Sequence, residues 1–293
     1  MTASATLESS SCATPTHRPL SVRSHGLTDR GRNRESNEDQ FLIATLNQAL
    51  QVQDSSVPQP EMQFGDPQGH LFVVADGCGG HAAGEKASAL AVRTIEQFTV
   101  DALNWCARLR PGADGGALLG EFHKALSRAN DRVYDEGMRR PELRGMATTL
   151  TLAYSHGRDL FVAHVGDSRC YLLRCGLLYR LTRDHTLVAE MVRRGHIKAE
   201  EAAHHAYRHV VTNVVGGSDP AVQVEVHKLA LEVGDCLLLC SDGLTEMASD
   251  GEILQVLTTA QPDPAAACER LVKLANDKGG KDNITAVVAV FGE

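Results

Sequence analysis

Apolar and polar positions follow two different patterns along the chain, and the pattern changes near Met146. Before it, apolar residues at helical spacing predict two long helices, over about 84–108 and 118–133. A short apolar run over 71–75 predicts a strand that leads into a turn before the first helix. Later strands are predicted over 149–154, 160–165, 169–174, 178–181, 222–229, 236–240 and 284–291, and later helices over 187–194, 199–206, 251–259 and 264–277.

The order of these elements predicts an α+β fold, in which helices cover antiparallel sheets. Residues 1–20 are rich in Ser, Thr and Ala without periodicity, which predicts a disordered N-terminal tail. Residues 46–69 contain Gln, Ser, Pro and Gly and predict a hairpin loop lengthened by an insertion. The length of the chain allows one large domain or two small ones. We interpret 21–293 as a single domain.

Composition excludes several classes of function. The formal net charge of −8 gives no sign of the basic surface that binds nucleic acid. There is no apolar run of membrane-spanning length, and the first 20 residues lack the apolar core of a signal peptide. The eight cysteines are scattered without paired zinc-ligand spacing, which is typical of reduced thiols. We therefore expect a cytoplasmic protein that neither inserts into a membrane nor binds nucleic acid.

Candidate chemistry lies at five acidic sites, most of them at a predicted strand border beside Gly, Ser or Asn. They are Asn37-Glu38-Asp39, Asp76-Gly77, Gly166-Asp167-Ser168, Ser241-Asp242-Gly243 and Asp282-Asn283. Carboxylates gathered at one sheet edge would form hard oxygen ligands for Mg²⁺ or Mn²⁺, and two such cations can activate a water against a phosphoryl group. Each Asp-Gly pair could equally be only a turn, so the pattern by itself leaves the function open.

These sites lie in motifs that resemble, in order, those of the metal-dependent protein phosphatase 2C family in its bacterial form. The similarity extends from about 25 to 291. The matching stretches are 31–41 (GRNRESNEDQF), 73–88 (VVADGCGGHAAGEKAS), 145–150 (GMATTL), 165–171 (VGDSRCY), 181–185 (LTRDH), 240–245 (CSDGLT) and 281–285 (KDNIT). The resemblance implies a phosphoserine/phosphothreonine phosphatase in which metal-activated water attacks phosphorus directly.

The resemblance also implies a metal set. Asp39 and Asp76 would be direct ligands, with Asp76 bridging two cations and the Gly77 carbonyl completing one site. Asp242 and Asp282 would hold the other cation. The expected cofactors are two Mn²⁺ or Mg²⁺ ions per chain.

Three further residues receive roles from the same resemblance. Glu38 would act mostly through water, and Asp167 would help to hold a third, weaker cation. Arg34 would bind the substrate phosphate, since a guanidinium offers a planar fork to phosphate oxygens. The alternative for Arg34 is an ordinary surface arginine. Cys78 stands where animal members carry a histidine proposed as general acid, so the proton donor to the leaving group has no assignment.

The implied fold is a four-layer α-β-β-α sandwich with a flap over about 185–217, beside the metal cleft. Histidines in this segment could suggest a zinc site, but a polar flap face is favoured because zinc needs fixed tetrahedral geometry. The implied partners are phosphorylated proteins, including a Hanks-type Ser/Thr kinase and its targets. Two alternatives are a catalytically inactive phosphoprotein-binding regulator, and a different two-metal hydrolase such as a nuclease. Inactive members usually lose metal aspartates, and nucleases commonly use histidine clusters with basic grooves.

Overall fold

Two antiparallel sheets form the centre of the molecule in the computed structural model, which describes residues 20–46, 50–55, 69–78, 82–106, 115–202 and 205–293. The first sheet has the order β1 (Ser21–Asp29), β13 (Ile284–Gly292), β12 (Cys236–Cys240), β8 (Arg169–Arg174) and β9 (Leu177–Arg180). The second has the order β10 (Val215–Gly216), β5 (Ala147–Thr148), β4 (Gly69–Cys78), β6 (Leu150–His156), β7 (Asp159–Val165) and β11 (Glu225–Ala230). Strand β2 (Asp39–Leu46) pairs with β4, and β3 (Leu50–Ser55) pairs with β2.

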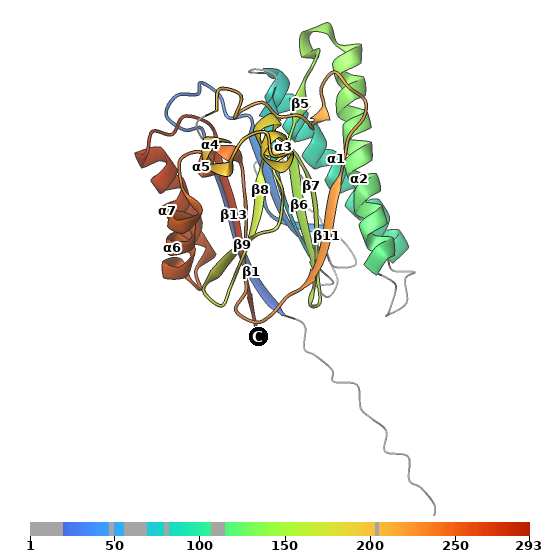
Figure 1. The fold of residues 1–293 in the computed structure, drawn as a ribbon. Helices are drawn as coiled ribbons and strands as arrows, with labels where there is room; N and C mark the ends of the chain where they lie inside the picture. Colours follow the sequence, from blue (N-terminus) through green and yellow to red (C-terminus); the bar gives the residue numbers. More distant parts are fainter. Residues whose placement is uncertain (1–19, 47–49, 56–68, 79–81, 107–114, 203–204) are drawn as a thin grey trace, which may run out of the picture.

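The sheets face each other and helices cover their outer sides (Figure 1). Strand β2 shows the reason for this layering, because its side chains alternate between two faces and are buried on both. Phe41 and Ile43 pack in a core shared with the first sheet, whereas Leu42 and Ala44 point to the opposite side. There they meet α1 (Ala82–Cys106) and α2 (Gly115–Arg139). The result is a helix–sheet–sheet–helix sandwich.

The outer face of the first sheet packs against α6 (Asp250–Ala260) and α7 (Pro264–Asp277). Ser249 begins α6 with a capping box in which its hydroxyl and the Glu252 side chain satisfy each other's backbone N–H. Asp263 caps α7 through Oδ1, which accepts from two helix N–H groups. Two shorter elements, α5 (Asp242–Thr245) and the 3₁₀ turn η1 (Pro141–Leu143), complete the connections.

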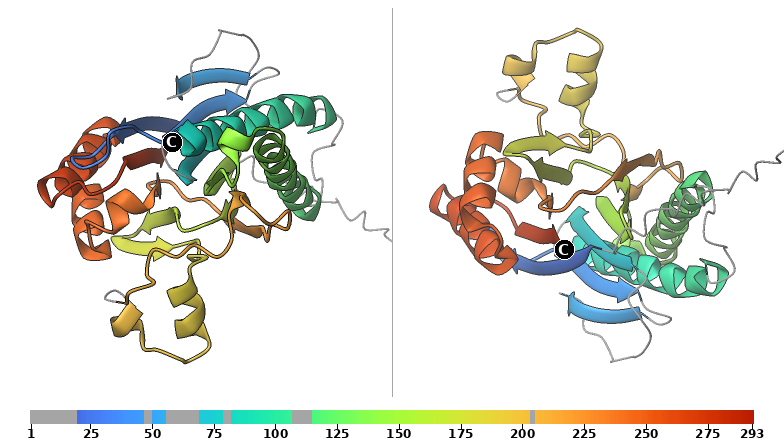
Figure 2. Two further views of the ribbon diagram at one scale, coloured as in Figure 1. Left: turned by 90° about the horizontal axis from the view of Figure 1, so that it is seen from above. Right: turned by 90° about the horizontal axis from the view of Figure 1, so that it is seen from below.

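The flap projects from the sandwich in both views of Figure 2 and carries α3 (Leu187–Arg193) and α4 (Ala199–Ala202). Its two ends are joined at the base, where Leu187 N–H donates to the Val210 carbonyl at 2.8 Å and Thr186 forms a bridge with Val211. His209 of the flap pairs with Glu246 just beyond α5. This contact holds the flap beside the end of the sandwich at which Asp242 lies.

The fold confirms the predicted α+β sandwich of two antiparallel sheets flanked by helices, and corrects it locally. Residues 50–55 form β3, so the loop prediction for 46–69 does not hold for these six residues; 47–49 and 56–68 lie outside the described residues. No residue range was predicted for strands β1 and β2, and the helix predicted over 199–206 ends at Ala202. The predicted tail lies outside the described residues up to residue 19. Within the described part of the chain, no helix has both the length and the apolarity needed to cross a membrane.

Candidate metal centre

The second sheet brings two of the predicted ligands face to face. Asp39 begins β2 and is directly paired with Asp76 near the end of β4. The Asp76 backbone is fixed from β5 and β6, because its carbonyl accepts from Thr149 N–H and from the Thr148 hydroxyl, both at 2.8 Å. Asp167 follows β7, whose last residue is paired with the first residue of β6. Three carboxylates therefore come from one end of this sheet.

The first sheet supplies two more. Asp242 follows β12 and opens α5, while Asp282 lies just before β13. Because β12 and β13 are antiparallel neighbours, with Cys240 opposite Ala286, the end of one strand lies beside the start of the other. The five predicted aspartates thus converge from both sheets onto one end of the sandwich.

Asp39 links the two sheets through side-chain hydrogen bonds. Its Oδ2 accepts from the Ser241 hydroxyl and from the Thr285 hydroxyl, each at 2.7 Å. Ser241 Oγ in turn accepts from Thr285 N–H at 2.9 Å. Sequence reasoning gave neither hydroxyl a role, although Ser241 and Thr285 both lie within quoted motifs. Asp39 is 1% exposed, and its Oδ1 has no hydrogen-bond partner among the described residues.

Asn283 was quoted in a motif without a role, and the structure gives it one. Its Nδ2 donates to the Arg30 and Ser36 carbonyls at 3.0 and 2.9 Å, and its Oδ1 accepts from Glu38 N–H at 2.8 Å. One side chain thereby fixes the loop between β1 and β2 that carries Arg34 and Glu38. The amide of asparagine suits this task because it has both donors and an acceptor.

Electrostatics distinguishes this cluster from ordinary turn aspartates. Burial raises the pKa of Asp39 to about 6, with a further contribution from the charge of Asp282. Burial, followed by the charge of Asp184, raises the pKa of Asp167 to about 6. For Asp76 and Asp242, burial and neighbouring carboxylates raise the pKa well above its usual range.

The donor set fits divalent cations. Asp242 Oδ1 is, like Asp39 Oδ1, buried without a hydrogen-bond partner in the described part of the chain. Burying a carboxylate oxygen without a partner costs free energy. A bound cation would pair with these oxygens and offset the repulsion between the carboxylates. Among the described residues, however, no three Asp, Glu, His or Cys side chains already surround a single point in ligand geometry. The fit therefore rests on proximity, burial and charge.

Glycines allow α1 to approach the cluster. A Cβ on Gly84 would lie 1.9 Å from Glu38 Oε2, and a Cβ on Gly77 would lie 2.3 Å from the Gly84 carbonyl oxygen. The Glu38 carbonyl accepts from the Ser88 hydroxyl at 2.6 Å, which ties this loop to α1. Glu38 and Gly77, both predicted at the centre, are thus neighbours at the start of α1.

Arg34 lies at the same end but is not free. Its Nη2 donates to Asp282 Oδ2 at 2.5 Å, and its side chain is 51% exposed. The predicted phosphate anchor and a predicted metal ligand therefore pair with each other. The exposure leaves the guanidinium accessible to a phosphate presented from outside.

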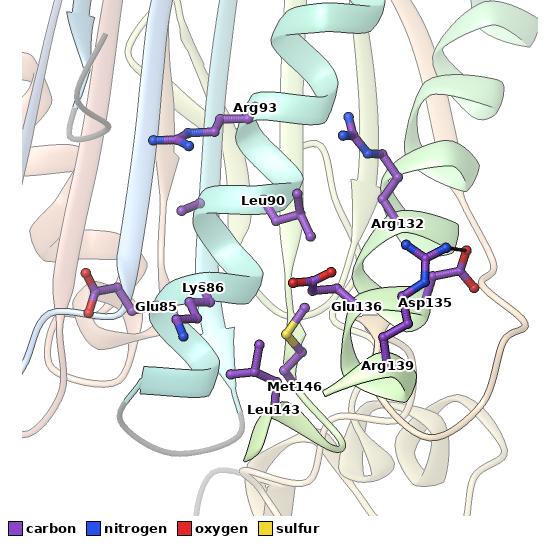
Figure 3. A pocket seen from close by; sticks show the side chains of 11 residues that line it. Glu85, Lys86, Leu90, Arg93, Arg132, Asp135, Glu136, Arg139, Leu143 and Met146 are labelled. Carbon is purple, nitrogen blue, oxygen red and sulfur yellow. Dashed lines mark ion pairs between the residues drawn. The ribbon is translucent and has the colours of Figure 1, made fainter. Parts of the chain in front are cut away.

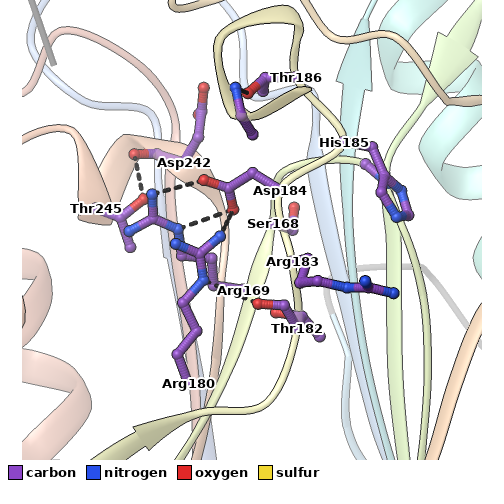
Figure 4. Close-up of polar contacts among 12 residues, drawn as sticks. Ser168, Arg169, Arg180, Thr182, Arg183, Asp184, His185, Thr186, Asp242 and Thr245 are labelled. Carbon is purple, nitrogen blue, oxygen red and sulfur yellow. Dashed lines mark hydrogen bonds and ion pairs between the residues drawn. The ribbon is translucent and has the colours of Figure 1, made fainter. Parts of the chain in front are cut away.

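A second carboxylate near Asp167 is neutralised by arginines (Figure 4). Asp184 accepts from Arg169 Nε at 3.0 Å and Nη2 at 2.8 Å, and pairs with Arg180. Burial acts to raise the pKa of Asp184, but this bidentate pair outweighs it and lowers the pKa. Asp184 therefore stays ionised next to Asp167 and is occupied by its arginine partners.

Cys78, at the position of the missing histidine, is a poor acid and a poor nucleophile. Burial, together with the charges of Asp167 and Asp242, raises the pKa of its thiol to about 12. His81, the histidine nearest to this position in the sequence, lies outside the described residues.

The groove in Figure 3 lies apart from these aspartates, between α1 and α2. It encloses about 600 Å³, and Leu90, Glu136 and Met146 point into the space between the helices. Its rim carries charges of both signs. They are Lys86, Arg93, Arg132 and Arg139 against Glu85 and Asp135. None of the five aspartates lines it.

Comparison with known proteins agrees with this geometry. Residues 47–286 match the family described as Protein phosphatase 2C. The serine/threonine protein phosphatase PstP of Mycobacterium tuberculosis is 39% identical over 219 residues, covering 75% of this chain and 40% of PstP. The serine/threonine phosphatase stp of Listeria monocytogenes is 34% identical over 261 residues, covering 89% of this chain and 92% of stp.

Solved structures give the same answer. A crystal structure of M. tuberculosis PstP has a TM-score of 0.73 at 34% identity, covering 94% of this chain and all of that one. The PstP catalytic domain in complex with two manganese ions gives 0.72 at 34% identity, covering 94% of this chain and 100% of that chain. The S. agalactiae serine/threonine phosphatase gives 0.76 at 32% identity, with 93% of this chain and 100% of that chain covered. The chain belongs to the protein phosphatase 2C family, among the relatives of bacterial serine/threonine phosphatases.

Proposed function

We propose that this protein is a metal-dependent phosphoserine/phosphothreonine protein phosphatase, and that residues 21–293 act as its single catalytic domain. The observation that carries the proposal is the cluster of aspartates whose pKa values are raised by burial, two of which have a carboxylate oxygen without a hydrogen-bond partner among the residues that the structure describes. Membership of the protein phosphatase 2C family and the manganese ions of the PstP neighbour support it.

The proposed ligand set follows the predicted roles. Asp39, Asp76 and the Gly77 carbonyl would hold one cation, and Asp242 and Asp282, together with Asp76, would hold the other. Glu38 would act through water, and Asp167 would help to hold a third, weaker cation. Bound Mn²⁺ or Mg²⁺ would supply an activated water and stabilise charge on the phosphoryl group.

The chain's own residues orient this chemistry. Ser241 and Thr285 hold one oxygen of Asp39, while its other oxygen has no hydrogen-bond partner among the described residues. Arg34 would exchange Asp282 for two oxygens of the substrate phosphate, because a phosphomonoester dianion offers a better bidentate partner. Cys78, with its raised pKa, stays a neutral thiol, which supports direct attack by water without a covalent intermediate.

The proposed substrates are phosphorylated proteins, including a Hanks-type Ser/Thr kinase and its targets. The half-exposed Arg34 suits a phosphate carried on another protein. Cys78, Cys170, Cys175, Cys236 and Cys240 form no disulfide within the described part of the chain, as expected in a reducing compartment such as the cytoplasm. Retention of all five aspartates argues against the alternative of an inactive phosphoprotein-binding regulator.

The test compares phosphate release from an aryl phosphate, a phosphothreonine peptide and a nucleic acid, with manganese or with a chelator. We expect manganese-dependent release from the first two only. Asp76→Asn should abolish release while the far-ultraviolet circular dichroism stays unchanged, and Asp131→Asn on the exposed face of α2 is the matched control. Absence of release by the unmodified protein, or full activity of Asp76→Asn, would contradict the proposal.

A further inference from the structure

The turn before Asp167 is held between two imidazoles, of which His164 is fully buried and His185 is partly buried. Gly166 N–H donates to His185 Nδ1 at 3.1 Å. The Gly166 carbonyl accepts from His185 N–H at 2.7 Å and lies 3.0 Å from His164 Nε2. The His164 and His185 ring centroids are 4.9 Å apart. None of these contacts belongs to the predicted ligand set.

The partners of each ring define its protonation. Among the described residues, the partners of His164 Nε2 are two carbonyl oxygens, those of Gly166 and Arg183 at 3.0 and 3.1 Å, so this nitrogen carries the proton. Burial and the neighbouring His185 lower the pKa of His164 to about 4, which leaves its Nδ1 to accept from the Thr151 hydroxyl at 2.8 Å. The ring is a neutral donor to the turn.

His185 has the same tautomer for a different reason. Its Nδ1 faces two N–H donors, Gly166 N–H at 3.1 Å and Asn213 Nδ2 at 2.9 Å, so Nδ1 carries a lone pair and the proton is on Nε2. The Asn213 amide cannot be reversed, because Nδ2 donates to the Gln223 carbonyl and Oδ1 accepts from Gln223 N–H. His185 Nε2 faces Glu225 Oε2 at 3.5 Å.

The same histidine joins both ends of the flap. It lies at the entry to α3, and its carbonyl accepts from Thr212 N–H at 2.8 Å and from the Thr212 hydroxyl at 3.0 Å. Thr212 and Asn213 belong to the returning end of the flap. A single residue therefore contacts the incoming end, the outgoing end and the turn that carries Asp167.

We propose that His185 is a positioning residue that fixes both peptide groups of Gly166, with its ring at the N–H and its backbone N–H at the carbonyl, and couples them to the base of the flap; this inference rests on the proposed function. The Gly166 carbonyl and Asp167 N–H share one peptide plane, so the contacts to that carbonyl set the direction in which the Asp167 side chain leaves the backbone. Gly166 has φ +114°, and a Cβ there would lie 2.5 Å from Thr149 Cβ, so the turn needs glycine and external support.

Two substitutions separate the functions of the ring. In His185→Asn, the amide oxygen takes the place of Nδ1 and can accept from Gly166 N–H, while the contact with Glu225 is lost. In His185→Gln, the amide reaches towards Glu225, while the acceptor for Gly166 N–H is lost. His227→Gln is the matched control, because His227 also pairs with Glu225 but makes no contact with Gly166.

The first readout is hydrogen exchange of the Gly166 amide in metal-free protein, measured by NMR. Loss of one hydrogen bond should accelerate exchange about fivefold in His185→Gln, and exchange in His185→Asn and His227→Gln should stay within about twofold of the unmodified protein. The second readout is the manganese concentration that gives half-maximal release from the aryl phosphate. This concentration should rise about fivefold in His185→Gln alone, with KM for the aryl phosphate unchanged.

Asn213→Ala provides a second variant, which removes the hydrogen bond from the flap to His185 Nδ1 and leaves the imidazole in place. It should raise exchange in the 208–215 segment and shift the manganese requirement in the same direction as His185→Gln. Equal behaviour of His185→Asn and His185→Gln would overturn the proposal, since the ring would then only fill space. If the unmodified protein releases no phosphate, the proposed function fails, while the exchange comparison still decides whether the His185 ring fixes the backbone at Gly166.

Discussion

Asp167→Asn should stabilise the metal-free protein at alkaline pH. The carboxyl group of Asp167 has an ordinary pKa of 3.8, which rises to about 6 in the fold because of burial and then the charge of Asp184. A carboxyl whose pKa is raised by folding contributes stability that is fully present below about pH 4 and is lost as the pH rises through about 6. A shift of about 2 units corresponds to about 3 kcal/mol, the cost of holding this carboxylate ionised at about pH 8. Asparagine has nearly the same volume and carries no charge, so it removes that cost.

The assay is urea unfolding in the presence of a chelator. The free energy of unfolding of Asp167→Asn should exceed that of the unmodified protein by about 3 kcal/mol at about pH 8, and by about 1 kcal/mol at about pH 4.5. Asp131→Asn, exposed on α2, should change it by less than about 0.5 kcal/mol at either pH. A gain of equal size at both values of pH, or a loss at about pH 8, would refute the claim that the ionised Asp167 carboxylate destabilises the metal-free fold.

Three further predictions concern the surroundings of the aspartates. Gly84→Ala places a Cβ 1.9 Å from Glu38 Oε2 and should raise the manganese concentration for half-maximal activity about tenfold, measured by titration of phosphate release. Asn283→Ala removes three hydrogen bonds to backbone groups and should lower the free energy of unfolding by about 3 kcal/mol in a urea titration; a loss below about 1 kcal/mol would contradict its role in the loop. Arg34→Ala should raise KM for a phosphothreonine peptide about tenfold and Arg34→Lys by less, whereas equal values for the two variants would exclude bidentate phosphate binding.

The pattern of apolar runs was enough to predict most strands, because residues of the central strands are buried on both faces and read as continuous apolar segments. Strand β1 was missed because it lies at the edge of its sheet and only Gly26 in it is fully buried, which leaves its other positions free to be polar. The β-rich character of Leu50–Ser55 was hidden by polar residues for the same reason, since β2 is the one partner of β3 among the described strands.

The candidate site was predictable to the extent that its residues occur in local motifs. Asp39 and Asp76 could be named from their neighbours in sequence, and their direct pairing followed from the fold. The hydroxyls that hold Asp39 come from positions 202 and 246 residues away, and no local pattern encodes a contact of that range. The pairing of Arg34 with Asp282, 248 residues apart, is of the same kind.

The position of β13 has a consequence for the order of folding. This strand lies between β1 and β12, and its pairing with β1 joins Ser21 to Gly292. Closing so long a loop is slow, because its entropy is lost before its contacts form. Until it closes, Asp39 lacks the Thr285 hydroxyl and is not yet held near Asp282, so the proposed ligands are not assembled. Cation binding should therefore appear late in refolding, which makes it a reporter of the final long-range pairing of the chain.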